Sequence, residues 1–509
     1  MLQHTKIAGL VATGLICVGL SGPAAAQSFP PSVKPTCTVP EATFQSWFAG
    51  DAVEPNGAVW PADSLNFPEH NTRCDFYRWG AQMFLWLTSP EGNGWVLDGP
   101  TIFTVSPPVN GERKLIRNGQ GSAFEVTTRA TKRDDIAELA QAGSGGVLLS
   151  QQKSLVYYGV HVNDVYGYFL SAQKTAGPGS YFGSVTDFPI GPNDINQLNM
   201  YMASAFPGEQ LSDEMALTIE LKTSWVDAST LSNPDDYVTV KADSPSFTRN
   251  ADNTIWTRAG TEPLTLALVG MHVMGTVKNH PEFVWATFEH KDNTPDAGYF
   301  YTKPDGQTAY QPQPTSGSFT FHNGEFGTQA NVECAQQAST DGDGYEAGDL
   351  IAARLKTPTD DPIKPLACSD GIIPSNTIRE KPWGGKPDRN SEENNTLLIS
   401  LNQSVLSQLA VGDVRKNYIQ IGSIWTAPAT TAGIAPIPSR PPFTTADLRG
   451  SLDLYNSTME TYTFEGAPNC FSCHALFKDD KGNYPTNSFG AFELSHIYSE
   501  IEPLHPTGN

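Results

Sequence analysis

Residues 264–293 have the sequence LTLALVGMHVMGTVKNHPEFVWATFEHKDN. Their first run, up to Val277, is largely apolar at consecutive positions, which is typical of a strand that is buried on both faces. The following run, residues 283–290, is rich in aromatic and β-branched residues and predicts a second strand. A buried sheet is therefore expected at the centre of the fold.

Clusters of Gly, Pro, Asn and Asp separate further segments with the composition of strands. These strands are predicted at residues 95–105, 154–162, 166–172, 215–225 and 237–242. Apolar residues at helical spacing predict helices at residues 74–90, 194–203, 396–410 and 445–462. The expected fold class is α+β, with a predominantly antiparallel β body, flanking helices and a short, mainly helical C-terminal segment.

The N-terminus has the pattern of an export signal. Lys6 precedes an apolar run from Ile7 to Leu20, and an A-x-A sequence ends at Ala26. The run has 14 residues, fewer than the roughly 20 that a membrane-spanning helix needs. We expect cleavage after Ala26 and a mature protein that is periplasmic or secreted, without a membrane span.

Composition divides the rest of the chain into three parts. Residues 27–300 are expected to form the β-rich body with its N-terminal core helix. Residues 301–395 are rich in Pro, Gly, Asp, Asn and Thr and predict a loop-rich insertion. Residues 396–509 are expected to be the helical C-terminal segment.

The chain has a net charge of −22, which opposes binding to nucleic acids. The acidic excess would either favour a basic protein partner or serve only to keep the protein soluble. Outside the export signal and the sequence CFSCH there are four cysteines, and an oxidising compartment favours two disulfides among them. We favour the two pairings that close short loops, Cys37–Cys74 and Cys334–Cys368. Each would stabilise the fold by roughly 2–4 kcal/mol.

The sequence CFSCH at residues 470–474 has the spacing that attaches a c-type haem. Cys470 and Cys473 would form the two thioether bonds, and His474 would be the proximal iron ligand. A disulfide or a zinc site is the alternative, but no second C-x-x-C or H-x-x-x-H lies close enough to complete a zinc site. Only 35 residues follow His474, so the haem would lie against the β-rich body.

The ligand opposite His474 is left open by the sequence. Imidazole and thioether groups are the usual ligands that complete a haem iron, and no methionine follows Met459. The candidates are His496, His505, His272, Met274, His280, His290 and Met459, or no protein ligand at all.

Residues 218–224 alternate in polarity and place Thr218, Glu220, Lys222 and Ser224 on one face of a strand. The neighbouring Glu and Lys could serve acid–base chemistry, or they could form a solvated face or a structural ion pair. His272 shares a strand face with Met274, where a histidine is either a hydrogen-bonded core residue or a ligand.

Four segments resemble a family of secreted bacterial proteins loosely called cytochrome c family proteins. They are CDFYRWGAQMFLWL, ALTIELKTSW, LVGMHVMGTVKNHPEFVWATFEHKDN and LYNSTMETYTFEGAPNCFSCH. The resemblance implies one covalent haem on Cys470, Cys473 and His474, attached to a large body whose function it does not specify. We expect a periplasmic monohaem cytochrome that transfers electrons to or from a redox partner. The alternative is a haem-dependent oxidoreductase of the peroxidase or oxygenase type, with an open iron and a substrate pocket.

Overall fold

The structure is a computed structural model. It describes residues 29–69, 71–119, 146–326, 330–338, 348–352, 371–427, 447–462, 469–474 and 491–505, and the backbone of residues 124–125. The expected export signal lies outside these residues.

Seven α-helices are described. They are α1 Glu41–Ser46, α2 Arg73–Leu87, α4 Asp164–Lys174, α5 Tyr181–Ser184, α6 Pro192–Ala205, α7 Glu392–Gln408 and α8 Cys470–His474. The strands of the main sheet are β3 Ile102–Val105, β4 Leu115–Arg117, β5 Phe124–Glu125, β6 Tyr157–Asn163, β7 Ile219–Asp227, β8 Thr239–Arg249, β9 Ile255–Val277, β10 His280–His290, β13 Ala335–Gln337, β14 Leu350–Ala352, β15 Tyr418–Thr426 and β16 Leu448–Gly450. Two small hairpins pair β1 Pro90–Glu91 with β2 Gly94–Trp95 and β11 Tyr299–Thr302 with β12 Thr308–Gln311.

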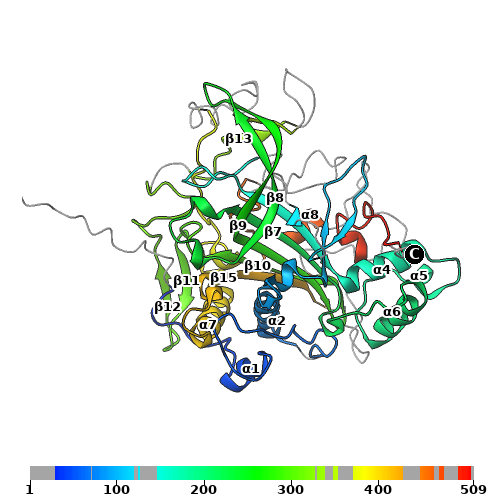
Figure 1. Cartoon of the computed structure of the whole chain (residues 1–509). Helices are drawn as coiled ribbons and strands as arrows, with labels where there is room; N and C mark the ends of the chain where they lie inside the picture. The colour runs from blue at the N-terminus through cyan, green and yellow to red at the C-terminus, as the bar shows by residue number, and fades with distance from the viewer. Residues whose placement is uncertain are drawn as a thin grey trace, which may run out of the picture.

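The main sheet runs in the order β16-β15-β10-β9-β7-β6-β3-β4. Every pair along this path is antiparallel, and the hairpin of β9 and β10 lies in its middle. The stretch at residues 264–293 thus forms the centre of the sheet, as predicted. The first half of β9 pairs with β8 and with β14 (Figure 1). The strand β5 pairs with β8, and β13 pairs with β14.

The two faces of the sheet carry different elements. Figure 1 shows α2 and α7 below β10 and β15, and α8 on the upper side of these strands. On the α2 face, Phe84 stacks on Phe288 with ring centroids 4.5 Å apart. Trp285 faces the other way, because side chains alternate along a strand, and its ring contacts Phe471 and His474 of α8. The sheet therefore separates an apolar helical layer from the CFSCH sequence.

The expected α+β class with a mostly antiparallel body is confirmed. The helices predicted at residues 74–90, 194–203 and 396–410 correspond to α2, α6 and α7. Residues 418–426, within the predicted helical C-terminal segment, form β15 and pair with β10 of the body. The body and the C-terminal segment therefore share one sheet.

The strand predicted at residues 166–172 is wrong, because this segment lies in α4. The Asn163 side chain caps the helix by accepting a hydrogen bond from the Tyr166 backbone N–H. Every residue from Asp164 to Ala172 is buried, so the helix has no exposed face over this stretch. The aromatic residues favoured a strand, but the helix cap was the stronger signal.

The helix predicted at residues 445–462 is also wrong for the residues described, 447–462. They form β16 and then a series of turns. Asn456 and Thr458 bond to each other locally, since the Thr458 N–H donates to Asn456 Oδ1 at 2.9 Å. Such side-chain bonds to the backbone compete with helix formation.

The cysteines of the body agree with the predicted pattern as far as they are described. Cys37 and Cys74 form a disulfide that ties the N-terminal segment to α2. Cys334 is disulfide-bonded. Cys368 lies outside the described residues, so its pairing with Cys334 stays a prediction. Among the described residues, none of the helices combines the length and apolar composition that crossing a membrane requires.

Candidate functional site

The site is built around α8, a single helical turn that consists of CFSCH. Residues three and four positions apart lie on one side of a helix, so Cys470 is on the same side as Cys473 and His474. The residue before the turn is anchored, because the Asn469 side chain donates a hydrogen bond to the Leu452 carbonyl oxygen at 2.9 Å. The Cys473 side chain is outside the described atoms.

His474 is oriented by the backbone of the chain's last segment. Its Nδ1 lies 2.8 Å from the carbonyl oxygen of Leu494, so Nδ1 carries the proton and Nε2 keeps its lone pair. Burial and the neighbouring His496 hold the pKa of His474 well below its usual range. The imidazole is therefore neutral, and a neutral ring that donates through Nδ1 to a carbonyl is the form that binds metals through Nε2.

Two aromatic rings cover His474. The ring of His496 stacks on it with centroids 3.9 Å apart and an interplanar angle of 11°. The Trp285 ring lies 4.5 Å away at 53°. Two imidazoles on opposite sides of one metal would have centroids about 6 Å apart, since each metal–nitrogen bond is about 2 Å. His496 is therefore stacked on His474 and does not lie opposite it.

The other candidates for the second axial position are dispersed. His272 and Met274 lie on β9, on the sheet face that α8 covers, and Met274 pairs with Trp285. His280 bonds to Glu282 and packs on Phe76 of α2, and His290 stacks on Tyr237. Met459 is buried in a separate apolar cluster with Tyr158 and Phe321, and His505 is exposed near the end of the chain.

The sheet face beneath α8 carries ionisable side chains in register. Lys222 on β7 is paired with His272 on β9, and Glu220 is paired with Met274. Lys222 and Glu220 are only 7% and 6% exposed. The alternation predicted for residues 218–224 therefore exists, but this face is buried and is not a solvated surface.

Glu460 joins this face from the segment that leads to α8. Its Oε1 lies 2.9 Å from His272 Nε2 and 3.9 Å from Lys222 Nζ. Burial alone would raise its pKa, but His272, Lys222 and the Asn456 N–H together lower it below its usual value. Glu460 is thus ionised. We call Glu220, Lys222, His272 and Glu460 the polar cluster.

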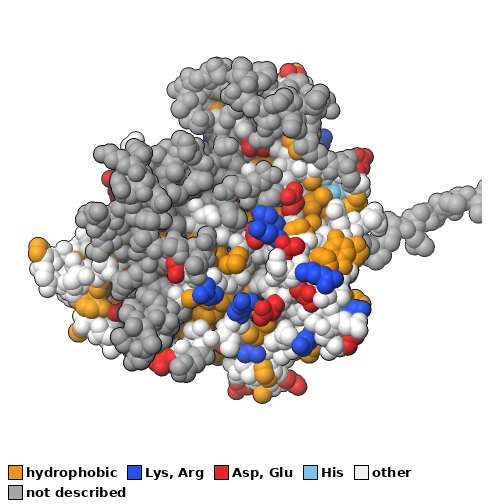
Figure 2. Space-filling view, turned by 180° about the vertical axis from the view of Figure 1, so that it is seen from behind, with side chains coloured by type: hydrophobic (Ala, Val, Ile, Leu, Met, Phe, Trp, Pro, Cys, Tyr) orange, Lys and Arg blue, Asp and Glu red, His pale blue; other side chains and the backbone are white. Residues whose placement is uncertain are grey.

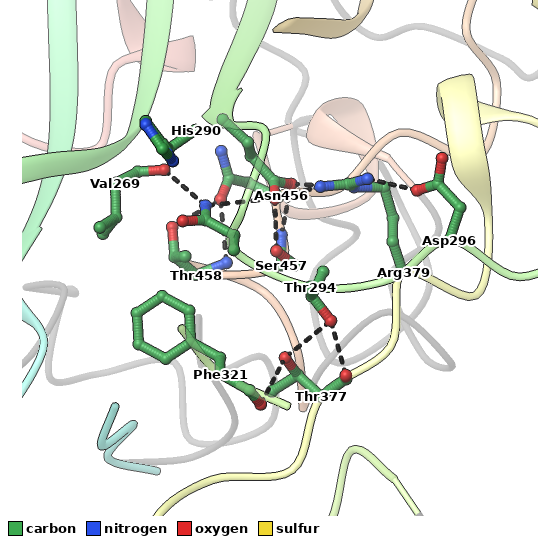
Figure 3. Close-up of polar contacts among 12 residues, drawn as sticks. Val269, His290, Thr294, Asp296, Phe321, Thr377, Arg379, Asn456, Ser457 and Thr458 are labelled. Atoms are coloured by element: carbon green, nitrogen blue, oxygen red, sulfur yellow. Dashed lines mark hydrogen bonds and ion pairs between the residues drawn. The ribbon is translucent and has the colours of Figure 1, made fainter. Parts of the chain in front are cut away.

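A second buried network fixes the segment that carries Glu460 (Figure 3). Arg379 is 1% exposed and bonds to Glu289 of β10 and to Asp296. Glu289 also accepts a hydrogen bond from the Ser457 N–H at 2.8 Å. Asn456 bonds β10 at the Phe288 carbonyl oxygen, at 3.0 Å. The segment is therefore attached to β10 at Asn456 and Ser457, which are four and three residues before Glu460.

Close packing against the sheet completes this attachment. Gly270 of β9 lies under the segment, where a Cβ atom would be only 2.4 Å from Thr458 Oγ1 and 2.6 Å from Ser224 Oγ. A larger residue at this position would force the side chains of Thr458 and Ser224 to move.

Comparisons with protein-family models, with curated proteins and with solved structures find no match to this chain. The assignment of this site therefore rests on its geometry and on the CFSCH motif.

The described residues fit a c-type haem. Cys470 and His474 lie on one side of a helical turn, and His474 is in the neutral tautomer that binds metals through Nε2. Covalent attachment would use Cys470 and Cys473. The sequence predicted these three residues, but it did not identify Leu494, Trp285 or Glu460. A lone Glu and a lone Trp have no spacing that marks them, and a backbone carbonyl has no sequence signature.

Proposed function

We propose that this chain is an exported monohaem c-type cytochrome that transfers single electrons. The haem would be bound covalently by Cys470 and Cys473, with His474 as its proximal ligand. It supplies a one-electron couple when bound. The body and the C-terminal segment would hold this group against one face of the central sheet.

The observation that carries the proposal is the hydrogen bond from His474 Nδ1 to the Leu494 carbonyl oxygen. An outer hydrogen bond of this kind fixes the ring orientation and makes Nε2 a better ligand. A structural histidine beside a disulfide would not need a neutral, fixed ring. The combination of CFSCH on one helical turn with this bond favours haem.

The surroundings of His474 suit an electron carrier. His496 and Trp285 cover the imidazole, and Leu494, whose carbonyl oxygen accepts its hydrogen bond, is buried. Exclusion of water lowers the local dielectric and so makes the redox potential sensitive to nearby charges. The polar cluster supplies such charges.

The partner would be another redox protein, in keeping with export and with the net charge of −22. The excess of acidic residues favours a basic partner. In the face seen in Figure 2, acidic and basic side chains are interspersed on the described surface, so this face has no patch of a single sign among them.

The direct test is whether haem is attached. The full-length protein, produced with a c-type haem maturation system, is examined by intact mass and by its pyridine haemochrome spectrum. We expect the mass to include one haem, and Cys473→Ser to lose the attachment at one of the two positions. Ser472→Ala, in the same turn, is the matched control and should retain haem. A protein without covalent haem under these conditions contradicts the proposal.

The polar cluster favours a second candidate, a haem-dependent oxidoreductase. His272 and Glu460 form a buried acid–base pair at 2.9 Å on the face that α8 covers. Carbon monoxide distinguishes the two candidates. Slow or absent binding to the ferrous protein and a low-spin ferric spectrum support the carrier. Rapid binding and a high-spin ferric spectrum support the enzyme.

A further inference from the structure

Glu220 is a buried carboxyl group, and one of its two oxygens lacks a hydrogen-bond partner among the described residues. It lies on β7 and is 6% exposed. Its Oε2 is buried and has no hydrogen-bond partner among the described residues. Burial raises the pKa of Glu220 to about 7, against the opposing effects of Ser495, Lys222 and Arg113. A carboxyl group in this environment can change its protonation state near neutral pH.

The carboxyl is connected to the segment that holds His474. The Ser495 side chain lowers the pKa of Glu220, and Ser495 Oγ lies 2.8 Å from the hydroxyl of Tyr166 in α4. Ser495 directly follows Leu494, whose carbonyl oxygen accepts from His474. The residue beside Glu220 and the residue that accepts the His474 hydrogen bond are thus neighbours in the chain.

The charges around Glu220 are already paired with other groups. Lys222 lies 3.9 Å from Glu460, which also bonds to His272. Arg113 forms an ion pair with Glu500 at 2.5 Å. The group therefore contains three carboxylates and two permanent cations when Glu220 is ionised. Protonation of Glu220 removes the excess negative charge.

Glu220 is also close enough to respond to one added electron. It pairs with Met274, and Met274 pairs with Trp285, whose ring contacts His474. Two strand spacings, from the position of Glu220 to that of Trp285, amount to about 10 Å. A unit charge at about this distance from a carboxyl group, with an effective dielectric constant of about 20, would change its proton affinity by about ten- to twentyfold.

We propose that Glu220 takes up one proton when the haem accepts one electron, so that the protein carries both together. This inference depends on the proposed haem function. The proton passes from water to the Glu220 carboxylate, which becomes a carboxylic acid, and the electron comes from a one-electron donor protein. The summed charge of the haem and this buried group then stays the same on reduction.

The test is the midpoint potential of the full-length haem protein, measured by spectroelectrochemistry from about pH 5 to about pH 9. A tenfold difference in proton affinity corresponds to 59 mV for a one-electron couple. We expect the wild-type potential to fall by about this amount as the pH rises through neutrality. Glu220→Gln should have a flat profile, whereas Glu54→Gln, which changes an exposed carboxyl, should behave as the wild type does.

A flat wild-type profile overturns the inference, and so does a fall of the same size in Glu220→Gln. If Glu220→Gln does not fold, the infrared difference spectrum between reduced and oxidised wild type decides the matter. Reduction should produce the carbonyl stretch of a protonated carboxylic acid, and its absence overturns the inference. A mass without haem instead contradicts the proposed function itself.

Discussion

The imidazole rings of His474 and His496 are stacked in parallel, with centroids 3.9 Å apart. The two residues are separated by 22 positions, and the chain returns to α8 through Leu494, which accepts the His474 hydrogen bond. His496 covers one face of the His474 ring. It is thereby part of the wall of the site and does not lie opposite His474.

This geometry predicts the behaviour of His496→Phe. An aromatic ring without nitrogen keeps the stacking, so we expect covalent haem and an unchanged ferric spin state. The measurement is the ferric absorption spectrum, with electron paramagnetic resonance at low temperature. Conversion from a low-spin to a high-spin spectrum would identify His496 as an axial ligand and contradict the prediction.

Glu460 should stabilise the fold in a pH-dependent way. Its folded-state pKa is lowered, so its contribution is fully present above the ordinary value of 4.5 and is lost as the pH falls through the folded-state pKa. Glu460→Gln leaves Lys222 without its carboxylate. We expect a loss of about 2–4 kcal/mol at neutral pH.

The difference between wild type and Glu460→Gln should decrease progressively as the pH is lowered below 4.5. Urea unfolding at several pH values measures it. Glu54→Gln, at an exposed site, should match the wild type throughout. A difference that is independent of pH would show that the effect of Glu460 is steric and not electrostatic.

Arg379 should be among the most sensitive positions for stability. Arg379→Met would leave Glu289 and Asp296 buried without their cation, and breaking a buried pair in this way costs about 3–5 kcal/mol. Denaturant unfolding is the measurement. Arg258→Met, at an exposed arginine, should change the free energy of unfolding by less than about 0.5 kcal/mol. Equal effects of the two substitutions would contradict the assigned role of the network.

Gly270 is expected to tolerate no larger side chain. Gly270→Ala would place Cβ within 2.4 Å of Thr458 Oγ1, and overpacking of this kind costs about 1–3 kcal/mol. Gly177→Ala is the matched control, since a Cβ there meets no atom within 4 Å. Thermal unfolding of both variants compares them, and a stable Gly270→Ala would show that the segment can move away from the sheet.

The disulfide between Cys37 and Cys74 closes a loop with a sequence separation of 37. Loop-closure entropy predicts that Cys37→Ser/Cys74→Ser loses about 4 kcal/mol. Chemical unfolding without reductant measures this loss. A double variant as stable as the wild type would mean that the N-terminal segment contributes little to the folded state.

The central strands, α2, α7 and the Cys37–Cys74 disulfide were predictable because each depends on local sequence. Alternation and helical spacing are properties of neighbouring residues, and two cysteines near in sequence form a short loop. The errors came from segments where two local signals compete. In α4 the Asn163 cap outweighed the aromatic composition. After β16, side-chain bonds of Asn456 and Thr458 replaced the predicted helix.

By itself, the sequence determined the spacing of CFSCH, the alternation that puts Glu220 and Lys222 on one strand face, and an antiparallel β body. Only the tertiary structure decided which groups meet. Glu460 reaches His272 across 188 positions, and Leu494 reaches His474 across 20. Such contacts depend on sheet order and on where a segment without regular structure is attached. Long-range packing sets both, and no local pattern in the chain encodes them.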